Sequence, residues 1–533
     1  MGRDREELLI SLLRYNEQKG GTEMAVYIFN LWVGYAPCGV DNAQGYRAKM
    51  LRSFSQPAKY VFIELPPRER IAYYNKVGID KQQMLSAHYF FAGHLSLQTS
   101  VKLEDKLREF KESMPWLETE VRRDEVCLHE GGKIHVSLVP DRKDREYLDK
   151  IYYFIDGKLV RRETYADSIV YAEGFMTAKS EDKLYAKLVK RTFYKKDGTV
   201  SYEQIFENGK ELYLLPDGRK CAKQQFVAEF IKKLKLSESD IVILDRCVQS
   251  DFVQPLFRFG NRARFITVLH SEHYFEEGRD SNRYYRYLNW EYLYWFKYSR
   301  MIDTMVVSTQ EQKEKLAEDL RKYQCFVPEI EVIPAGGIEG LKYPEKARKP
   351  YSLIAVSRLQ ARKEPGWVIK SAIKAHKRNP EITLDYYGEG MLRPELEALI
   401  EENQAQGYVR LMGYKDVTNT YREYEVFVTA SVWETLGLST MEAIGSGTAA
   451  IGLDVPYGNR LFIRPEENGY LVAYDGTDTD EEEMTDLLAE KMIRIFEDER
   501  RLESFHRKSY EIASEFLTQH IEEKWKRLLA RPF

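Results

Sequence analysis

The sequence predicts an α/β protein with two Rossmann-like, doubly wound domains and an antiparallel, β-rich insertion within the first domain. Two observations lead to this fold class. Short apolar runs alternate with stretches of helical pattern near the start of the chain and again from about Tyr351, as in parallel sheets covered by helices. Between about Leu85 and Lys220, alternating aromatic and charged residues are instead separated by tight-turn dipeptides.

The first domain is expected in two parts, residues 1–84 and 221–345. The earlier part has an apolar strand from Ala25 to Leu31, a glycine-containing turn and a helical stretch from Asn42 to Phe54. A strand, a glycine turn and a helix in this order begin a doubly wound unit. The later part has three apolar runs that predict buried parallel strands, at residues 241–244, 265–269 and 304–307.

The insertion is expected over residues 85–220. Its main evidence is a set of dipeptides whose residues tolerate positive φ and therefore suit tight hairpin turns. Several such turns in a short span predict an antiparallel meander, which could hold an acceptor, contact a partner or mediate self-association. The dipeptides are Asp156-Gly157, Asp197-Gly198, Asn208-Gly209 and Asp217-Gly218.

The second domain is expected over residues 346–515, followed by a terminal segment, 516–533, with an amphipathic helix from Phe516 to Leu529. Apolar runs separated by helical stretches of about 10 to 15 residues predict a parallel sheet here. The runs are Leu353–Val356, Ile382–Tyr386, Val409–Met412, Val426–Thr429 and Ala449–Leu453.

Composition narrows the functional classes. The 533 residues suffice for about three domains, and 80 Lys and Arg against 84 Asp and Glu give no support for nucleic-acid binding through a basic surface. Five scattered cysteines without a C-x-x-C pair fit a reducing cytoplasm rather than a disulfide framework or a zinc site.

No membrane span is expected. A short amphipathic patch, Glu7 to Tyr15, leaves open a peripheral contact with the inner face of the cell membrane.

Polar and glycine-rich segments follow the strands predicted for the second domain. Open parallel sheets bind ligands beyond the carboxyl ends of their strands, so these segments should meet at one edge of the sheet. They are Ser357-Arg358, Gly388-Glu389-Gly390, Gly413-Tyr414 and Ser431 to Leu438.

The most informative segment is Trp433 to Ala443, in which Glu434 and Glu442 bracket the start of a short helix. Free N–H groups and the helix dipole make a helix N-terminus a seat for phosphate. Carboxylates instead accept hydrogen bonds from sugar hydroxyls. Phosphate donors flanked by hydroxyl acceptors indicate a nucleotide-sugar site.

These residues carry a family resemblance that runs from about Met24 to the C-terminus. The Glu-x7-Glu element, with Ser357-Arg358-Leu359 and Lys363, resembles the donor site of family 4 retaining glycosyltransferases of GT-B fold. More narrowly, three segments resemble the accessory-Sec glycosyltransferases of serine-rich repeat adhesins and the related poly(glycerol/ribitol phosphate) wall teichoic acid glycosyltransferases. They are Gly39 to Gln44, His270 to His273 and Glu442 to Gly447.

The resemblance implies a GT-B architecture, in which the two Rossmann-like domains face a cleft and the terminal helix crosses back to the first domain. It implies that Glu442 binds ribose and Glu434 the donor sugar, while Arg358 and Lys363 neutralise the diphosphate. The expected catalytic residues are His270, Arg358, Lys363 and Glu434, with Glu272 and His273 on the acceptor side. The remaining donor-binding candidates are Gly39, Val40, Ser357, Gly388, Tyr414, Gly437, Leu438, Ser439 and Thr440.

One departure from the family leaves the donor sugar open. Where the family usually has Glu-Gly-Phe-Gly-Leu, this chain has Glu434-Thr435-Leu436-Gly437-Leu438, which brings a Cβ and a hydroxyl close to the sugar. Either N-acetylglucosamine or glucose therefore remains possible as the transferred sugar.

No metal or other cofactor is expected. Asp478-Thr479-Asp480 matches a D-x-D metal motif, but it lies in an acidic run that is typical of a solvated loop leading into a helix. The Gly388-Glu389-Gly390 segment has Arg393 where a dinucleotide fingerprint has its third glycine, so NAD binding is not supported.

The resulting hypothesis is a retaining enzyme that moves N-acetylglucosamine or glucose from a UDP-sugar to serine or threonine hydroxyls of a serine-rich repeat adhesin before export. One alternative is a wall teichoic acid glycosyltransferase. Another is a non-catalytic co-activator or chaperone subunit of the same fold, which would not need the two cations and the two glutamates. The expected partners are the UDP-sugar, a serine-rich polypeptide, and either a co-activator subunit or a second copy of the chain.

Overall fold

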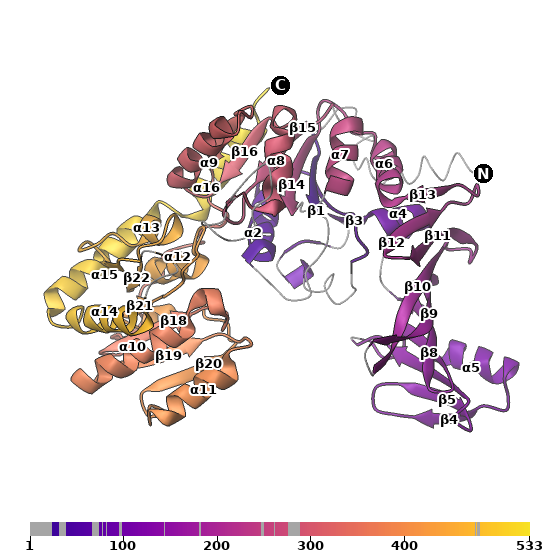
Figure 1. Cartoon of the computed structure of the whole chain (residues 1–533), viewed down its shortest axis with the longest axis horizontal. Helices are drawn as coiled ribbons and strands as arrows, with labels where there is room; N and C mark the ends of the chain where they lie inside the picture. Colours follow the sequence, from indigo (N-terminus) through magenta and orange to yellow (C-terminus); the bar gives the residue numbers. More distant parts are fainter. Residues whose placement is uncertain are drawn as a thin grey trace. The chain divides into compact units, whose positions relative to one another are not determined.

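The computed structural model describes residues 24–30, 39–66, 74–76, 78–80, 83–94, 99–142, 144–180, 183–246, 250–260, 262–274, 288–474, 476 and 480–532. The patch at Glu7 to Tyr15 and the pair Asp478-Thr479 lie outside them. The chain divides into two units, Met1–Pro37 with Leu51–Phe265, and Cys38–Met50 with Ile266–Phe533 (Figure 1). The domain limits expected from the sequence stay predictions.

The first sheet has seven strands in the order β17-β16-β15-β14-β1-β2-β3, and the boundary between the units passes through β15. β1 pairs in parallel with β14 and β2, and β16 pairs in parallel with β15 and β17. The apolar runs predicted as strands are confirmed. The strands are β1 (Val26–Asn30), β2 (Ala58–Phe62), β3 (Met84–Ser86), β14 (Ile241–Arg246), β15 (Arg264–Val268), β16 (Thr304–Val307) and β17 (Glu329–Val332).

The second sheet lies wholly in the second unit and has six parallel strands in the order β20-β19-β18-β21-β22-β23. The five predicted apolar runs form the first five of these strands, and β23 adds a sixth. They are β18 (Ser352–Val356), β19 (Thr383–Tyr387), β20 (Val409–Gly413), β21 (Val426–Val428), β22 (Ala449–Leu453) and β23 (Gly469–Val472).

Helices cover both faces of the six-stranded sheet, and a buried apolar cluster forms on each face. Asp480, the described end of the D-x-D match, caps α14 by accepting from the backbone N–H groups of Glu482 and Glu483. The elements are η5 (Ala361–Lys363), α10 (Pro365–Arg378), α11 (Arg393–Glu402), η6 (Tyr421–Glu423), α12 (Leu438–Gly445), α13 (Gly458–Phe462), α14 (Glu481–Arg494) and α15 (Glu499–Ser514).

The insertion is a ten-stranded antiparallel sheet in the first unit, in sequence order from β13 to β4. All four predicted turns join adjacent strands, and Asp156 and Asn208 adopt positive φ there. The strands are β4 (Glu118–Val121), β5 (Val126–Glu130), β6 (Ile134–Pro140), β7 (Leu148–Ile155), β8 (Lys158–Tyr165), β9 (Ile169–Ser180), β10 (Lys183–Tyr194), β11 (Val200–Glu207), β12 (Lys210–Leu214) and β13 (Lys220–Ala222).

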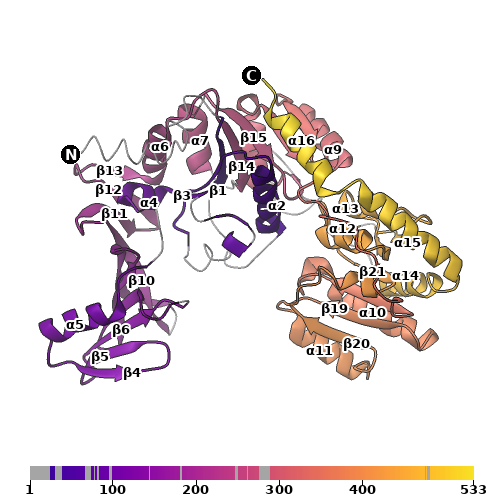
Figure 2. The ribbon, with the colours of Figure 1, turned by 180° about the vertical axis from the view of Figure 1, so that it is seen from behind.

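Two helices precede this sheet, where the alternating pattern had suggested more strand. α5 (Leu103–Ser113) lies beside strands of this sheet (Figure 2). Its side chains Leu107 and Phe110 pack against the apolar cluster of the sheet. A helix forms here because its apolar residues recur at helical spacing and cover one face of the strands. The other helices of the first unit are α4 (Ala87–Ala92), α6 (Lys223–Leu234) and α7 (Ser250–Phe259).

The second unit also contains α2 (Gly39–Ser53, up to Met50) and the C-terminal helix α16 (Thr518–Leu529). Arg47 of α2 lies over the Trp525 ring of α16, 5.0 Å from its centroid. Lys524 donates to the Val332 carbonyl of β17 at 3.3 Å, which holds α16 against the seven-stranded sheet. The remaining elements are η3 (Trp290–Tyr292), α8 (Leu293–Lys297), η4 (Ser299–Met301) and α9 (Gln310–Lys322).

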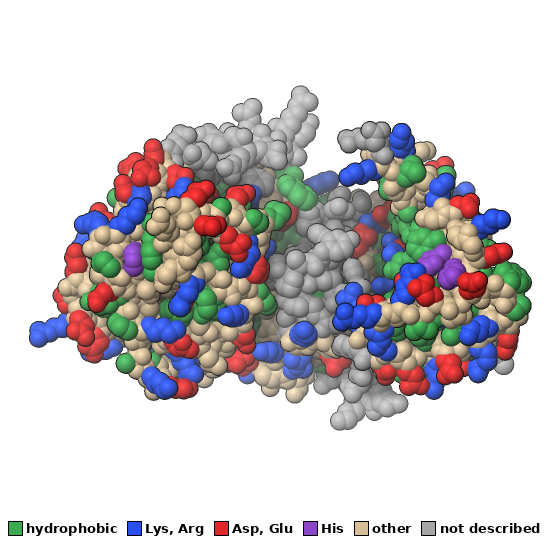
Figure 3. Space-filling model, turned by 90° about the horizontal axis from the view of Figure 1, so that it is seen from below, with side chains coloured by type: hydrophobic (Ala, Val, Ile, Leu, Met, Phe, Trp, Pro, Cys, Tyr) green, Lys and Arg blue, Asp and Glu red, His purple; other side chains and the backbone are tan. Residues whose placement is uncertain are grey.

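None of the described helices combines the length and the apolar character that crossing a bilayer requires. On the face drawn in Figure 3, acidic and basic side chains are interspersed rather than gathered by sign.

Candidate active site

The loops that follow β18, β19, β20 and β21 are joined to one another at the carboxyl edge of the six-stranded sheet. The Ser357 N–H donates to the Tyr387 carbonyl at 3.1 Å, and the Gly388 N–H donates to the Gly413 carbonyl at 3.0 Å. The Val432 N–H donates to the Arg362 carbonyl at 3.2 Å. The four polar segments predicted to meet are therefore neighbours, as expected for the ends of parallel strands.

Gly388 permits the closest of these approaches. Its φ is +148°, and a Cβ there would lie 1.8 Å from the Ser357 carbonyl oxygen. No other residue type fits without moving the backbone. The two loops can therefore lie edge to edge only because this position is glycine.

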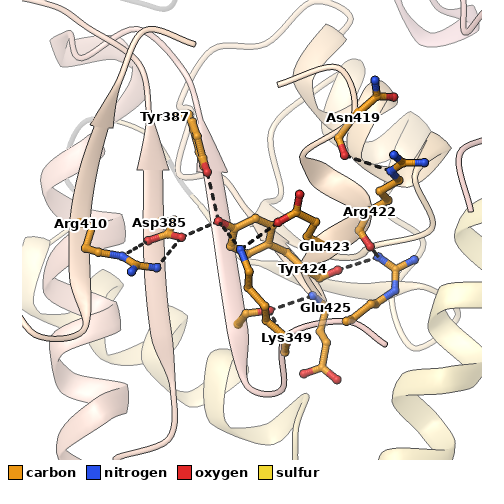
Figure 4. Close-up of polar contacts among 11 residues, drawn as sticks. Lys349, Asp385, Tyr387, Arg410, Asn419, Arg422, Glu423, Tyr424 and Glu425 are labelled. Atoms are coloured by element: carbon orange, nitrogen blue, oxygen red, sulfur yellow. Dashed lines mark hydrogen bonds and ion pairs between the residues drawn. The ribbon is translucent and has the colours of Figure 1, made fainter. Parts of the chain in front are cut away.

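A polar network inside the sheet supports β19, the strand that ends at Tyr387. Arg410 of β20 binds both oxygens of the buried Asp385 at 2.6 and 2.7 Å (Figure 4). Tyr424 also donates to Asp385, and its hydroxyl lies 3.1 Å from that of Tyr387. The network fixes the strand directly before the glycine loop, and the sequence analysis had not predicted it.

Lys363 and Glu434 form a direct ion pair. The Lys363 ammonium at the end of η5 donates to Glu434 Oε2 and, at 3.0 Å, to the Ser431 hydroxyl. About a fifth of each side chain is exposed (19% and 22%). A cation and a carboxylate predicted to face the same ligand thus already lie together, partly shielded from water.

Arg358 supplies a second positive charge at the same edge. Its side chain is exposed, and in the part of the chain that the structure describes no carboxylate pairs with it. Tyr414, directly after β20, is 83% exposed. A cation without a carboxylate partner and an exposed ring are both available to a ligand.

Helix α12 begins immediately after Gly437, whose φ of +80° only glycine adopts without strain. The N–H groups of Leu438, Ser439 and Thr440 lie in its first turn, where the helix provides no acceptor for them. No acidic residue lies in that turn. The sequence-based prediction of a helix start between the two glutamates is confirmed. The first turn of this helix, which is predicted to bind phosphate, contains no negatively charged side chain.

Glu442 lies one turn into α12, and both of its oxygens have a tyrosine hydroxyl nearby. Tyr421 of η6 donates to Oε2 at 3.4 Å, and Tyr46 of α2 donates to Oε1 at 3.5 Å. Burial raises the pKa of the Glu442 carboxyl, and the Tyr421 hydroxyl, the charge of Lys342 and the Tyr46 hydroxyl oppose that effect. The sequence analysis missed both tyrosines, because nothing local connects Tyr46 to a residue 396 positions later.

The three candidates that follow β15 have different surroundings. His270 is half-buried, whereas Glu272 is buried. His273 is fully buried, its Nε2 lies 3.0 Å from Asp319 of α9, and burial lowers its pKa. In this conformation His273 holds the loop against α9, and His270 alone of the three presents part of its surface. Gly39 and Val40 form the start of α2, with Gly39 exposed.

Glu311, in the first turn of α9, makes a further contact that the sequence did not suggest. It accepts from the Tyr457 N–H at 2.9 Å and from Arg460 at 2.8 Å. The adjoining Gly458 N–H donates to the Glu434 carbonyl at 3.2 Å. The loop before α13 therefore connects α9 to the backbone of the glutamate that is paired with Lys363.

Comparison with known proteins agrees with this geometry. Residues 350–498 match the model of glycosyl transferases group 1, and residues 118–217 match that of the GtfA extended beta-sheet domain. The UDP-N-acetylglucosamine–peptide N-acetylglucosaminyltransferase GtfA subunit of Streptococcus pneumoniae is 36% identical over 508 residues, covering 95% of this chain and 98% of that protein. The chain belongs to the GtfA glycosyltransferases.

Solved structures of this family have the same fold. The pneumococcal O-GlcNAc transferase GtfA, in complex with UDP and GlcNAc, is 34% identical with a TM-score of 0.83 and covers 96% of this chain and 99% of that one. A chain of the GtfA/B complex also gives 0.83, with 33% identity and coverage of 95% and 99%. The fold is therefore GT-B with an antiparallel extension, and the protein is a glycosyltransferase.

Proposed function

We propose that this chain transfers N-acetylglucosamine from UDP-N-acetylglucosamine to serine and threonine hydroxyls of a serine-rich polypeptide, with the retention of configuration typical of family 4. The observation that carries the proposal is the start of α12, bracketed by Glu434 and Glu442 and faced by Lys363. The names of the relatives, which specify a UDP-N-acetylglucosamine donor and a peptide acceptor, support the same substrates.

The diphosphate would lie over the first turn of α12. The N–H groups of Leu438, Ser439 and Thr440 would bind the distal phosphate, and Lys363 and Arg358 would balance about two negative charges. Lys363 would then be shared between Glu434 and the phosphates. Ser357, Gly388 and Gly437 would line the nucleotide site, while the exposed Tyr414 ring would pack on the base.

The sugars would be bound by the two glutamates, Glu442 contacting the ribose and Glu434 the transferred sugar. Thr435, beside Glu434, would shape the sugar pocket. His270 would contact the sugar and the acceptor from the loop after β15, and Gly39 and Val40 would close over the phosphates. Because His273 is buried against Asp319, we leave it out of the direct acceptor contacts.

Catalysis would rest on position and charge. The cations and the α12 N-terminus would stabilise the charge that develops on the leaving UDP. A phosphate oxygen of that leaving group would accept the proton of the attacking hydroxyl on the same face of the sugar, so retention needs no enzyme nucleophile. Holding the two substrates in register supplies much of the remaining rate enhancement.

The acceptor would be modified in the cytoplasm before export, with the help of a second subunit. The relative is named a GtfA subunit, and a solved complex joins GtfA to GtfB. We therefore include a co-activator subunit of this kind among the partners. The antiparallel extension is the part of the chain that we assign to the acceptor and to this partner.

A donor and acceptor screen tests the proposal. The purified chain, alone and with its partner subunit, is incubated with UDP-N-acetylglucosamine or UDP-glucose and with a serine-rich peptide or poly(glycerol phosphate). We expect an N-acetylhexosamine mass gain on the peptide that Glu434→Gln abolishes. Transfer only to poly(glycerol phosphate), or only from UDP-glucose, would contradict the proposed acceptor or donor.

A further inference from the structure

Two tyrosine hydroxyls from distant parts of the chain converge on the Glu442 carboxylate. Tyr421 approaches Oε2 at 3.4 Å, and Tyr46 approaches Oε1 at 3.5 Å. Both distances exceed the roughly 2.5–3.0 Å of an ordinary hydrogen bond between two oxygens, so both contacts are weak. A ligand hydroxyl that reached Oε1 at ordinary distance would therefore form a better bond than Tyr46 does.

Burial makes these hydroxyls important to the carboxylate. Burial raises the pKa of Glu442, and it also raises the pKa of Tyr46, with the negative charge of Glu442 as the next cause. Tyr46 is thus a neutral donor held beside a half-buried carboxylate. Removing this donor without a replacement would leave Oε1 with one hydrogen-bond donor fewer.

Other contacts hold Tyr46 and its helix in place. A Cβ on Gly336 would lie 3.1 Å from the Tyr46 ring and 2.9 Å from Leu438, the first residue of α12, so all three are packed together. On the same helix, Arg47 lies over Trp525, and Lys49 pairs with Glu339 at 3.2 Å. The bond to Glu442 is one contact among several, so its loss should leave α2 in position.

We propose that the Tyr46 hydroxyl occupies, in the nucleotide-free protein, the place of a ribose hydroxyl on Glu442, and that nucleotide binding exchanges one for the other. The inference rests on the proposed contact between Glu442 and ribose. Tyr421 is fully buried and keeps its bond to Oε2 during the exchange. Tyr46 is then a positioning residue that keeps the carboxylate solvated until the nucleoside arrives.

The exchange has a consequence for α2. This helix begins at Gly39 and Val40, the residues proposed to close over the phosphates. When ribose replaces Tyr46, α2 loses its hydrogen bond to α12 and retains its contacts to α16 and Glu339. Occupancy of the ribose site thereby removes one contact of α2, while the other contacts hold the helix in position.

Titration calorimetry with UDP and with 2′,3′-dideoxyuridine diphosphate tests the exchange. Tyr46→Phe removes the competing hydroxyl and keeps the ring, so we expect it to bind UDP about three- to tenfold more tightly than the wild type. Its affinity for the dideoxy nucleotide should be unchanged, because that ligand has no hydroxyl to offer Glu442. Lys49→Met, on the same helix, should alter neither affinity, and matching melting temperatures show that the variants fold alike.

The possible failures are distinguishable. If Tyr46→Phe binds UDP as the wild type does or more weakly, or tightens both ligands equally, the exchange is wrong while the proposed donor site stands. If Tyr46→Phe, which has no competing hydroxyl, binds UDP and the dideoxy nucleotide equally, Glu442 does not contact the ribose, and that part of the proposed function falls together with the inference.

Discussion

Lys363 and Glu434 each neutralise the other before any substrate is bound. The ion pair places an ammonium and a carboxylate side by side where both are partly shielded from water. The ammonium can therefore bind a diphosphate and the carboxylate can accept hydrogen bonds from sugar hydroxyls without a large rearrangement of either side chain.

Replacing Lys363 with methionine should lower transfer from UDP-N-acetylglucosamine about 10²- to 10³-fold. The change removes a cation that stabilises the leaving diphosphate and strands Glu434 without its partner. Steady-state kinetics with a serine-rich peptide measure the effect. Lys370→Met is the matched control, since Lys370 of α10 pairs with Glu481 at 2.9 Å away from the proposed site. Activity of Lys363→Met within twofold of the control would remove Lys363 from the mechanism.

Gly388→Ala should destabilise the second domain by about 2 kcal/mol or more, because a Cβ cannot share space with the Ser357 carbonyl and the φ of +148° is strained for alanine. Urea unfolding measures the loss. Gly407→Ala is the control, because a Cβ at Gly407 meets nothing within 4 Å. Equal midpoints for the two variants would show that the loops separate at little cost.

At the scale of single elements, α4 is a short apolar helix that buries a histidine in an aromatic cluster. The His88 Nδ1 lies 2.8 Å from the Tyr202 hydroxyl, and its ring stacks on Phe193. Burial lowers the pKa of His88 to about 3, with the charges of Arg191 and Lys223 as lesser causes. The helix is thus docked through an imidazole that must stay neutral.

The free energy of unfolding should therefore fall as the pH drops below about 6.5, because His88 then binds a proton in the unfolded chain and stays neutral in the folded chain. The loss from His88 should approach about 1.4 kcal/mol per pH unit down to about pH 3. Urea unfolding of the full chain at pH 7.0 and 5.5 measures this loss. His88→Phe keeps the aromatic packing and removes the titration, so its stability should depend less on pH. The same pH slope in both proteins would refute the assignment.

At the scale of the whole molecule, the ten-stranded antiparallel extension exposes large apolar side chains, which a protein without a binding partner would not need. Met176 of β9 is 62% exposed, and Tyr185 lies diagonally across from it on β10. Exposed apolar residues gathered on one face of a sheet are typical of an interaction surface. A second subunit of the kind proposed above would cover them.

Met176→Lys should weaken binding of the co-activator subunit about tenfold or more, because it places a charge in an apolar contact. Thr177→Lys is the matched control, since neighbouring residues on a strand point to opposite faces. Calorimetric titration of each variant with the partner subunit measures both affinities. Equal affinities for the two variants would place the partner elsewhere on the chain.

Much of the architecture was determined by local sequence. The period of the apolar runs predicted the parallel strands, and dipeptides such as Asn208-Gly209 predicted the hairpins, because both signals depend on residues close together in the chain. The start of α12 between Glu434 and Glu442 was readable for the same reason. The helices α4 and α5 were not predicted, because the turn-forming dipeptides that follow them in the sequence indicated a β-rich insertion over the whole segment.

Only the tertiary structure decided which distant residues complete the site. It brought Tyr46 to Glu442, Glu311 to the loop before α13, and Arg410 to Asp385. It also buried His273, which by its place in the sequence could equally have faced a substrate. Such pairings follow from how helices pack on sheets, and a hydroxyl or an imidazole carries no local sign of the partner that packing will bring to it.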